Sequence, residues 1–157
     1  MRFTVNRDVF SEAVSFAVKL LPQRPTQPLL SGVLIEAVEG EITLSAFDYE
    51  TSARTSVTAD VVEAGRVLVS GRLLGEIAQR LPHSDVELSL VDTRVQVRCG
   101  ASSFSLPAMP VEEYPQVPRI DAVSGSVPAD VFAEAVAQVS LAASKDDVTP
   151  VITGVQF

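Results

Sequence analysis

Asp48 and Glu50 are the first candidates for chemistry in this chain, because two carboxylates stand at alternate positions. In an extended segment both side chains would project from the same face, and such a pair can work as acid and base in an enzyme. The sequence offers no companion nucleophile, base or metal site beside them. Catalysis by this pair stays an alternative, and we favour turn formation and surface solubility.

The other reactive side chains are isolated. His83 is the one histidine and lies beside Pro82, which is typical of a solvated turn residue. Cys99 is the one cysteine, and its alternating surroundings indicate an ordinary strand residue. Neither residue belongs to a metal-ligand spacing. Gly71 and Gly75 faintly resemble a phosphate-binding loop, but a helical pattern runs through them and no Lys-Ser or Lys-Thr pair follows. We expect no metal and no cofactor.

Basic residues at helical spacing are more informative, and they fall on two predicted helices, 7–20 and 72–81. The first ridge of polar residues, opposite an apolar stripe, consists of Arg7, Ser11, Ser15 and Lys19. The second consists of Arg72, Glu76 and Arg80. The second helix is expected to turn inward Leu73, Leu74, Ile77, Ala78 and Leu81. Many acidic residues fall in predicted strands and turns, so we expect the helix layer to be less acidic than the sheet layer. Two ordinary solvated helix faces would explain the same pattern.

The sequence that carries the first of these predicted helices is repeated further along the chain. Residues 8–14 (DVFSEAV) match 130–136 (DVFAEAV), and 28–33 match 150–155 at the same offset of 122. Ten of the 32 aligned pairs are identical, where chance gives about two. Two unrelated amphipathic helices would not explain a matched proline and glycine. The repeat predicts a second module that is incomplete at Phe157, in a chain that is a fragment of a longer one.

The first 120 or so residues follow the order strand, helix, three strands, twice. Strands are expected at 3–5, 29–37, 41–47, 51–61, 66–70, 86–91, 93–99 and 102–106. Asn6 is placed to cap the first helix. This predicts an α+β fold of internally duplicated β-α-β-β-β units, with two helices packed on antiparallel sheet. The proline-rich stretch 107–121 is predicted to connect a first domain, 1–121, to the beginning of a second, 122–157.

Composition narrows the class of protein. The net charge of −8 argues against nucleic acid at first sight, because DNA-binding proteins neutralise phosphates with Lys and Arg. However, a partner meets one face rather than the whole-chain sum. No apolar run approaches the ~20 residues that span a bilayer, and the N-terminus turns polar too soon for a signal peptide. We expect a cytoplasmic protein without a membrane partner.

Five segments in order carry a resemblance to a known family. They are MRFTVNRDVF, LPQRPTQPLLSGVLIE, FDYETSA, VLVSGRLLGEIAQRLP and FSLPAMPVEEYP. Together they resemble the first domain of the bacterial DNA polymerase III β subunit, the sliding clamp, with the actinobacterial branch most similar. The resemblance covers residues 1–121, and residues 122–157 resemble the start of the second domain.

The resemblance implies a non-enzymatic processivity factor of DNA replication. In this family three such domains follow one another, and a homodimer closes a six-domain ring that encircles duplex DNA and tethers the replicative polymerase. The clamp loader is a further partner. Phosphate contacts carry no sequence information and can exchange as a ring slides. The alternative from another class is a protein-interaction module of the same fold without a DNA role.

The resemblance also assigns roles to individual residues. Arg24 matches a DNA-contacting arginine of the family in the same loop. The residues on helices that face the hole are Arg7, Lys19, Arg72 and Arg80, and Lys145 lies in the second-copy loop that faces DNA. Phe104 and Leu106 match the edge strand that pairs with the third domain of the partner subunit. The peptide-binding pocket of the family lies mostly beyond this chain, so we expect the fragment neither to close a ring nor to bind polymerase peptides well.

Overall fold

The computed structural model describes residues 1–22, 25, 27–117, 125–146 and 148–156. The chain divides into two compact units, Met1–Pro118 and Arg119–Phe157. The domain boundary predicted between residues 121 and 122 lies outside the described residues. Each unit is described by itself.

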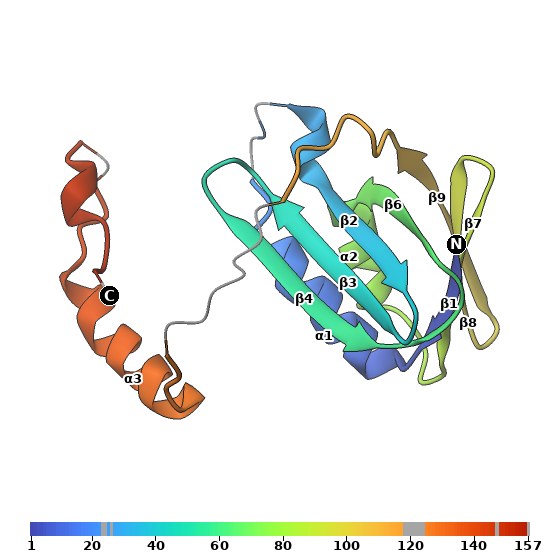
Figure 1. Ribbon diagram of the computed structural model, residues 1–157, viewed down its shortest axis with the longest axis horizontal. Coiled ribbons are helices and arrows are strands. Elements are labelled where there is room, and N and C mark those ends of the chain that lie inside the picture. The colour runs from blue at the N-terminus through green and yellow to red at the C-terminus, as the bar shows by residue number, and fades with distance from the viewer. Residues whose placement is uncertain (23–24, 26, 118–124, 147, 157) are drawn as a thin grey trace. The chain divides into compact units, whose positions relative to one another are not determined.

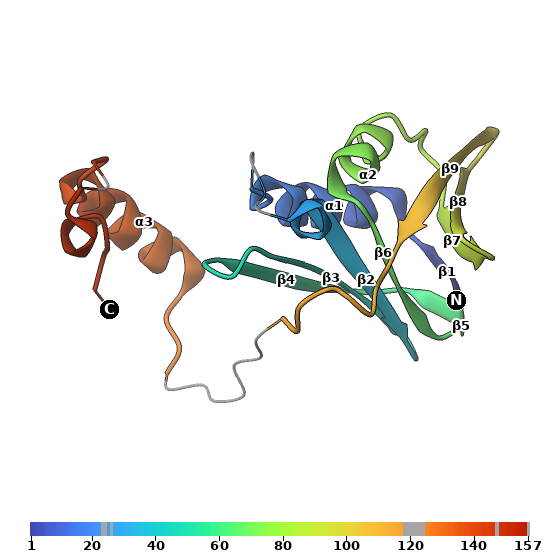
Figure 2. The same ribbon diagram turned by 90° about the horizontal axis from the view of Figure 1, so that it is seen from above.

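The first unit is a strongly curved antiparallel sheet with two helices on one face (Figures 1 and 2). Its elements are β1 (Arg2–Val5), α1 (Arg7–Lys19), β2 (Gly32–Val38), β3 (Glu41–Phe47), β4 (Ser52–Thr58), β5 (Asp60–Glu63), β6 (Gly65–Ser70), α2 (Gly71–Ala78), β7 (Val86–Val91), β8 (Arg94–Cys99) and β9 (Ser102–Met109). A 3₁₀ turn, Pro28–Ser31, precedes β2. The strands follow the order β4-β3-β2-β6-β9-β8-β7-β1-β5.

The duplication predicted from the sequence is confirmed by this strand order. The half β1-α1-β2-β3-β4 repeats as β6-α2-β7-β8-β9, and the neighbours β4-β3-β2-β6 correspond to β9-β8-β7-β1. Since β4 and β5 stand at opposite ends of the order but are separated only by Ala59, the sheet curls back on itself. The prediction of one strand over 51–61 is therefore wrong. The chain bends at buried Ala59, whose N–H donates to the Gly40 carbonyl at 3.1 Å, so that β4 pairs with β3 and β5 with β1.

The helices bury the faces that pack on this sheet. In α1 the buried residues are Phe10, Ala13, Val14 and Ala17, as the apolar stripe predicts. Asn6 caps the helix, since its Oδ1 accepts from the N–H groups of Asp8 and Val9 at 3.0 and 3.3 Å. In α2 the prediction of an inward Leu73 is wrong, because Leu73 is 38% exposed and the helix turns Gly71, Leu74, Gly75 and Ala78 inward.

The proline-rich connector begins later than the sequence indicates. Strand β9 continues through Pro107 to Met109. Tyr114 is buried, and its hydroxyl accepts the N–H of Phe47 at 3.0 Å. Burial raises the pKa of this hydroxyl above its ordinary 10.0, the Phe47 hydrogen bond lowers it and the charge of Asp48 raises it. The stretch around Tyr114 is thus packed on the first unit.

The second unit contains α3 (Ala129–Val139) and the 3₁₀ turns Ser140–Ala142 and Pro150–Ile152. Relative to the first copy, α3 and the last turn stand at the predicted offset of 122 from α1 and from Pro28–Ser31. Across both units, no helix among the described residues is long and apolar enough to cross a membrane.

Candidate nucleic-acid interface

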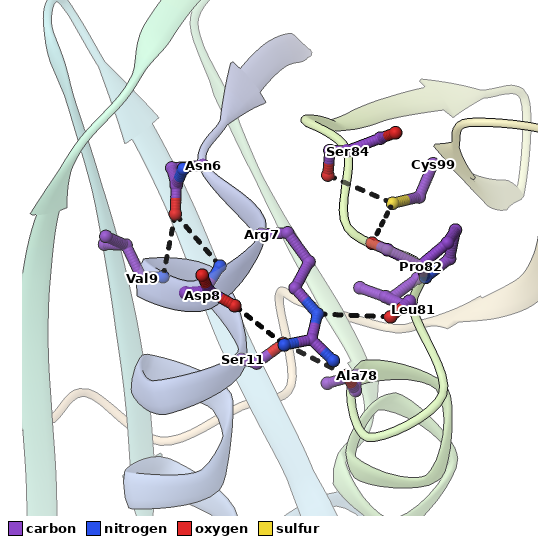
Figure 3. A network of polar contacts seen from close by, with 10 residues as sticks. All are labelled: Asn6, Arg7, Asp8, Val9, Ser11, Ala78, Leu81, Pro82, Ser84 and Cys99. Carbon is purple, nitrogen blue, oxygen red and sulfur yellow. Dashed lines mark hydrogen bonds and ion pairs between the residues drawn. The ribbon is translucent and has the colours of Figure 1, made fainter.

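The two helices of the first unit lie side by side and antiparallel. At one end, Ser11 Oγ donates to the Ala78 carbonyl at 3.0 Å, and Arg7 Nε donates to the Leu81 carbonyl at 3.1 Å. Residue numbers rise along α1 while those of its partners, on α2 and in the segment just after it, fall. Figure 3 shows this polar contact between the start of α1 and the end of α2.

At the other end of the contact between α1 and α2, the residues of α2 that face α1 are small. A Cβ on Gly75 would lie 3.4 Å from Val18 Cγ1, and one on Gly71 would collide with Leu21 Cδ1. The glycines therefore let the two helices approach closely. This packing accounts for the residues that faintly resemble a phosphate loop.

The outward surface of the helix pair carries three exposed cations, Lys19, Arg72 and Arg80. Arg72 Nε lies 3.4 Å from Glu76 Oε1, but the Arg72 side chain is 83% exposed and this surface pair constrains it weakly. Asp8 and Glu12 are also exposed on α1. The surface is therefore mixed rather than uniformly basic.

The ridge predicted on α1 does not lie wholly opposite the apolar stripe. Each step of four residues advances about 40° around a helix, so the ridge turns from α2 at Arg7 and Ser11 to solvent at Lys19. The Arg7 side chain is only 23% exposed, and its Nη1 also donates to Asp8 Oδ1 at 2.7 Å. Sequence periodicity could not reveal this, because the second helix covers part of the face that a lone helix would expose.

The charge contrast between the layers is clear. Residues 6–21 and 71–82, which contain the helices, carry four Lys or Arg and three Asp or Glu. The rest of residues 1–118 carries six basic and twelve acidic residues. A negative phosphate backbone would meet least repulsion at the helix layer.

Comparison with known proteins decides the family. The model of the DNA polymerase III beta subunit, N-terminal domain, matches residues 1–118. The chain belongs to this family. It is 52% identical to the beta sliding clamp of Streptomyces coelicolor over its whole length and 51% identical to that of Micrococcus luteus over 99% of its length. It spans 42% and 50% of those two relatives.

A solved structure of the family shows the same fold. The beta subunit from the DNA polymerase of Streptococcus pyogenes matches 98% of this chain with a TM-score of 0.88 at 20% identity, and the match spans 43% of that chain. The predicted α+β clamp fold is confirmed.

For two of the cations expected to face DNA, the structure gives no position relative to the helix pair. Arg24 is outside the described residues. Lys145 is exposed in the second unit, between Ser144 and Asp146. In the first unit, Lys19, Arg72 and Arg80 are exposed, and Arg7 is partly buried where the two helices meet.

The strand predicted to form the dimer interface has an unpaired backbone edge, but its two predicted interface side chains are largely buried. Among the described strands, β9 pairs with β8 from Ser102 to Pro107 and with β6 only at Ala108 and Met109. Leu106 is 1% exposed and belongs to the core of the first unit, while Phe104 is half-buried. An open edge of this kind can pair with a strand of another chain.

The carboxylates, the cysteine and the histidine that were first considered for chemistry occupy ordinary structural positions. Asp48 Oδ1 accepts from the N–H groups of Glu50 and Thr51 at 3.1 and 2.6 Å, which is the turn role expected for it. Cys99 is buried, and His83 is exposed. Within the described ranges, no group of three His, Cys, Asp or Glu residues could hold a metal ion.

Proposed function

We propose that this chain is the front part of a sliding clamp subunit, a non-catalytic processivity factor that encircles duplex DNA in the cytoplasm. The observation that carries the proposal is the near-neutral helix layer on a domain that is acidic elsewhere, in a chain that belongs to the clamp family. A ring is held on DNA topologically, so its lining needs no tight site.

The proposed contacts to DNA are weak and exchangeable. Lys19, Arg72 and Arg80 are exposed side chains on long flexible stems, which can pass from one phosphate to the next without reading bases. We place Arg24 and Lys145 in the same role on the ground of the resemblance. The acidic sheet and loops limit binding of DNA outside the ring.

The proposed partners follow from the ring. The open edge of β9 over residues 102–107 would pair with the partner subunit in a homodimer, and Phe104 would contribute an apolar contact beside it. The replicative polymerase and the clamp loader would bind the full-length subunit, mainly through domains beyond the first. We expect the 157-residue chain alone neither to close a ring nor to bind polymerase peptides with the affinity of the full-length subunit.

A topological experiment tests the proposal. The full-length subunit is loaded onto nicked circular DNA by its clamp loader, and the DNA is then cut once. Encirclement predicts that protein retained on the circle is released from the linear product. Retention that is indifferent to the cut would contradict it.

Substitution identifies the surface. Arg24→Ala in the full-length subunit should reduce loading while the protein keeps its fold, as judged by its thermal unfolding. Arg2→Ala is the matched control, because Arg2 is an exposed arginine of β1 that pairs with Glu87 at 2.7 Å, away from the helices. Equal loading by both variants at low salt would count against the assignment.

The second candidate is a protein-interaction module without a DNA role. A groove of about 250 Å³ between α1 and β4 favours it, since the apolar Val9, Phe16 and Val57 line the groove beside Glu12 and Arg54. Such a module would show no dependence on DNA topology, so the experiment with cut circles separates the two functions.

A further inference from the structure

The segment that follows α2 is held by side chains from α1 (Figure 3). Ser11 donates to the carbonyl of Ala78, the last residue of α2, and Arg7 donates to the carbonyl of Leu81. The last carbonyls of a helix have no partner within it, and a cation near this end is favourable. Ala78 and Leu81 are 1% and 3% exposed, so losing these donors would leave poorly hydrated carbonyls unsatisfied, which is costly.

The same segment is held again from the sheet. Cys99 Sγ, on β8, lies 3.2 Å from the carbonyl oxygens of both Pro82 and Ser84. The Ser84 N–H donates to the Pro82 carbonyl at 2.9 Å. The backbone from α2 to β7 is therefore fixed at several points, although its turn lies at the surface.

Arg80 stands between the two carbonyls that α1 holds. Its own N–H donates to the Ile77 carbonyl at 2.9 Å, and its side chain is exposed. The backbone on both sides of Arg80 is thus attached to α1 through Ser11 and Arg7. Movement of that attachment would move the point from which the Arg80 guanidinium reaches solvent.

We propose that Ser11 and Arg7 are positioning residues, which hold the end of α2 and so set the place of Arg80 on the DNA-facing surface. The inference rests on the proposed function and changes the role of Arg7, whose half-buried guanidinium serves the Leu81 carbonyl and Asp8 rather than a phosphate. Ser11 is the cleaner probe, since its hydroxyl carries no charge.

A double-mutant cycle in the full-length subunit tests this. The affinity for a short duplex at low salt is measured by fluorescence anisotropy for wild type, Ser11→Ala, Arg80→Gln and the double variant. Ser11→Ala should weaken binding about fivefold, the equivalent of one hydrogen bond, and should have little further effect when Arg80 is already replaced. Ser15→Ala, one turn along the same ridge, should bind like wild type.

Each other outcome has a defined meaning. If Arg80→Gln weakens binding but Ser11→Ala does not, or if the two effects simply add, the positioning role is overturned while the proposed function stands. If neither Arg80→Gln nor Arg72→Gln changes the affinity, the proposed DNA surface itself fails. Arg7→Lys separates the roles of Arg7: affinity close to wild type, together with a loss in Arg7→Gln, would make Arg7 a phosphate contact. Amide exchange supplies a check without DNA, because unchanged protection at residues 77–81 in Ser11→Ala would overturn the proposal.

Discussion

Helices α1 and α3 begin with nearly the same seven residues but reach opposite degrees of burial. Phe10 and Val14 of α1 are 0% exposed, whereas Phe132, which matches Phe10, is 44% exposed. Of the described residues of α3, none is buried. The difference is the sheet, since α1 packs on strands of the first unit, whereas the described residues of the second unit contain no strand.

The apolar stripe therefore specifies a helix but not a packed one. Both segments are helical because their residues have the right periodicity and lack helix breakers. Burial of the stripe needs the tertiary partner, and most helical stability in proteins comes from that packing. Matched substitutions at the 122-residue offset can therefore separate local from tertiary contributions.

The largest expected effect comes from the matched phenylalanines. Phe10→Ala should lower the free energy of unfolding by about 3–5 kcal/mol, because it leaves a cavity in the core. Phe132→Ala should change the unfolding of the first unit by less than about 0.5 kcal/mol. Denaturant unfolding of the 157-residue chain measures both. Similar losses in the two variants would show that α3 is packed in solution, and the comparison would fail.

Substitution of the matched glycines should have a smaller effect, which arises from overpacking rather than from a cavity. A Cβ on Gly32 would lie 2.7 Å from Leu68 Cδ1 and 3.0 Å from the Leu29 carbonyl oxygen, while Gly154 has nothing within 4 Å. Gly32→Ala should therefore destabilise by about 1–3 kcal/mol through overpacking. Gly154→Ala should be neutral within about 0.5 kcal/mol. Thermal unfolding distinguishes them, and a neutral Gly32→Ala would mean that Leu68 moves aside freely.

The helix starts differ by their caps. Asn6→Ala should cost about 1 kcal/mol, because two N–H groups lose their acceptor. The matching residue, Pro128, provides no side-chain cap to α3, so Pro128→Asn should increase helix content by circular dichroism. Unchanged helicity in Pro128→Asn would indicate that capping does not limit α3.

The smallest effect concerns the end of the first unit. The pKa of Tyr114 is raised, so the folded state favours the neutral hydroxyl. Its contribution to stability is full below the unfolded pKa of about 10 and is lost as pH rises through the higher folded pKa. Wild type should lose stability from about pH 10 upward more steeply than Tyr114→Phe. At neutral pH the variant should be less stable by about 1 kcal/mol, because the Phe47 N–H loses its acceptor.

The pH comparison is made by denaturant unfolding at about pH 8 and about pH 10.5, on either side of the ordinary tyrosine pKa. Tyr49→Phe is the control, since Tyr49 is 58% exposed and its hydroxyl should contribute little to stability at either pH. Parallel pH profiles for Tyr114→Phe and wild type would contradict the assignment of alkaline sensitivity to Tyr114.

Sequence reasoning was most successful for local features. It predicted the Asn6 cap, the inward face of α1 and the turn at Asp48, because each depends on residues within a few positions of one another. It also predicted the duplicated order of elements. It failed at Ala59 and Leu73, where the strand pairing and the helix orientation are decided by distant segments.

At the candidate site, too, some features could be predicted from the sequence and others could not. The periodic pattern predicts that Lys19, Arg72 and Arg80 lie at polar positions of two helices, and all three are exposed. It could not place the Arg7 guanidinium against the Leu81 carbonyl, which is 74 residues away. Nor could it bury Leu106 in the core, since that depends on how β9 packs.

By itself, then, the sequence determined where most of the helices and strands form, that one module begins twice, and which layer carries fewer negative charges. These properties follow from neighbouring residues and composition. The tertiary structure alone decided that the helices lie antiparallel and that Arg7 and Ser11 join them, and it supplied the sheet on which the predicted stripe of α1 is buried. Contacts between distant segments decide these features because burial and hydrogen-bond partners depend on what the folded chain brings together, which a local pattern does not contain.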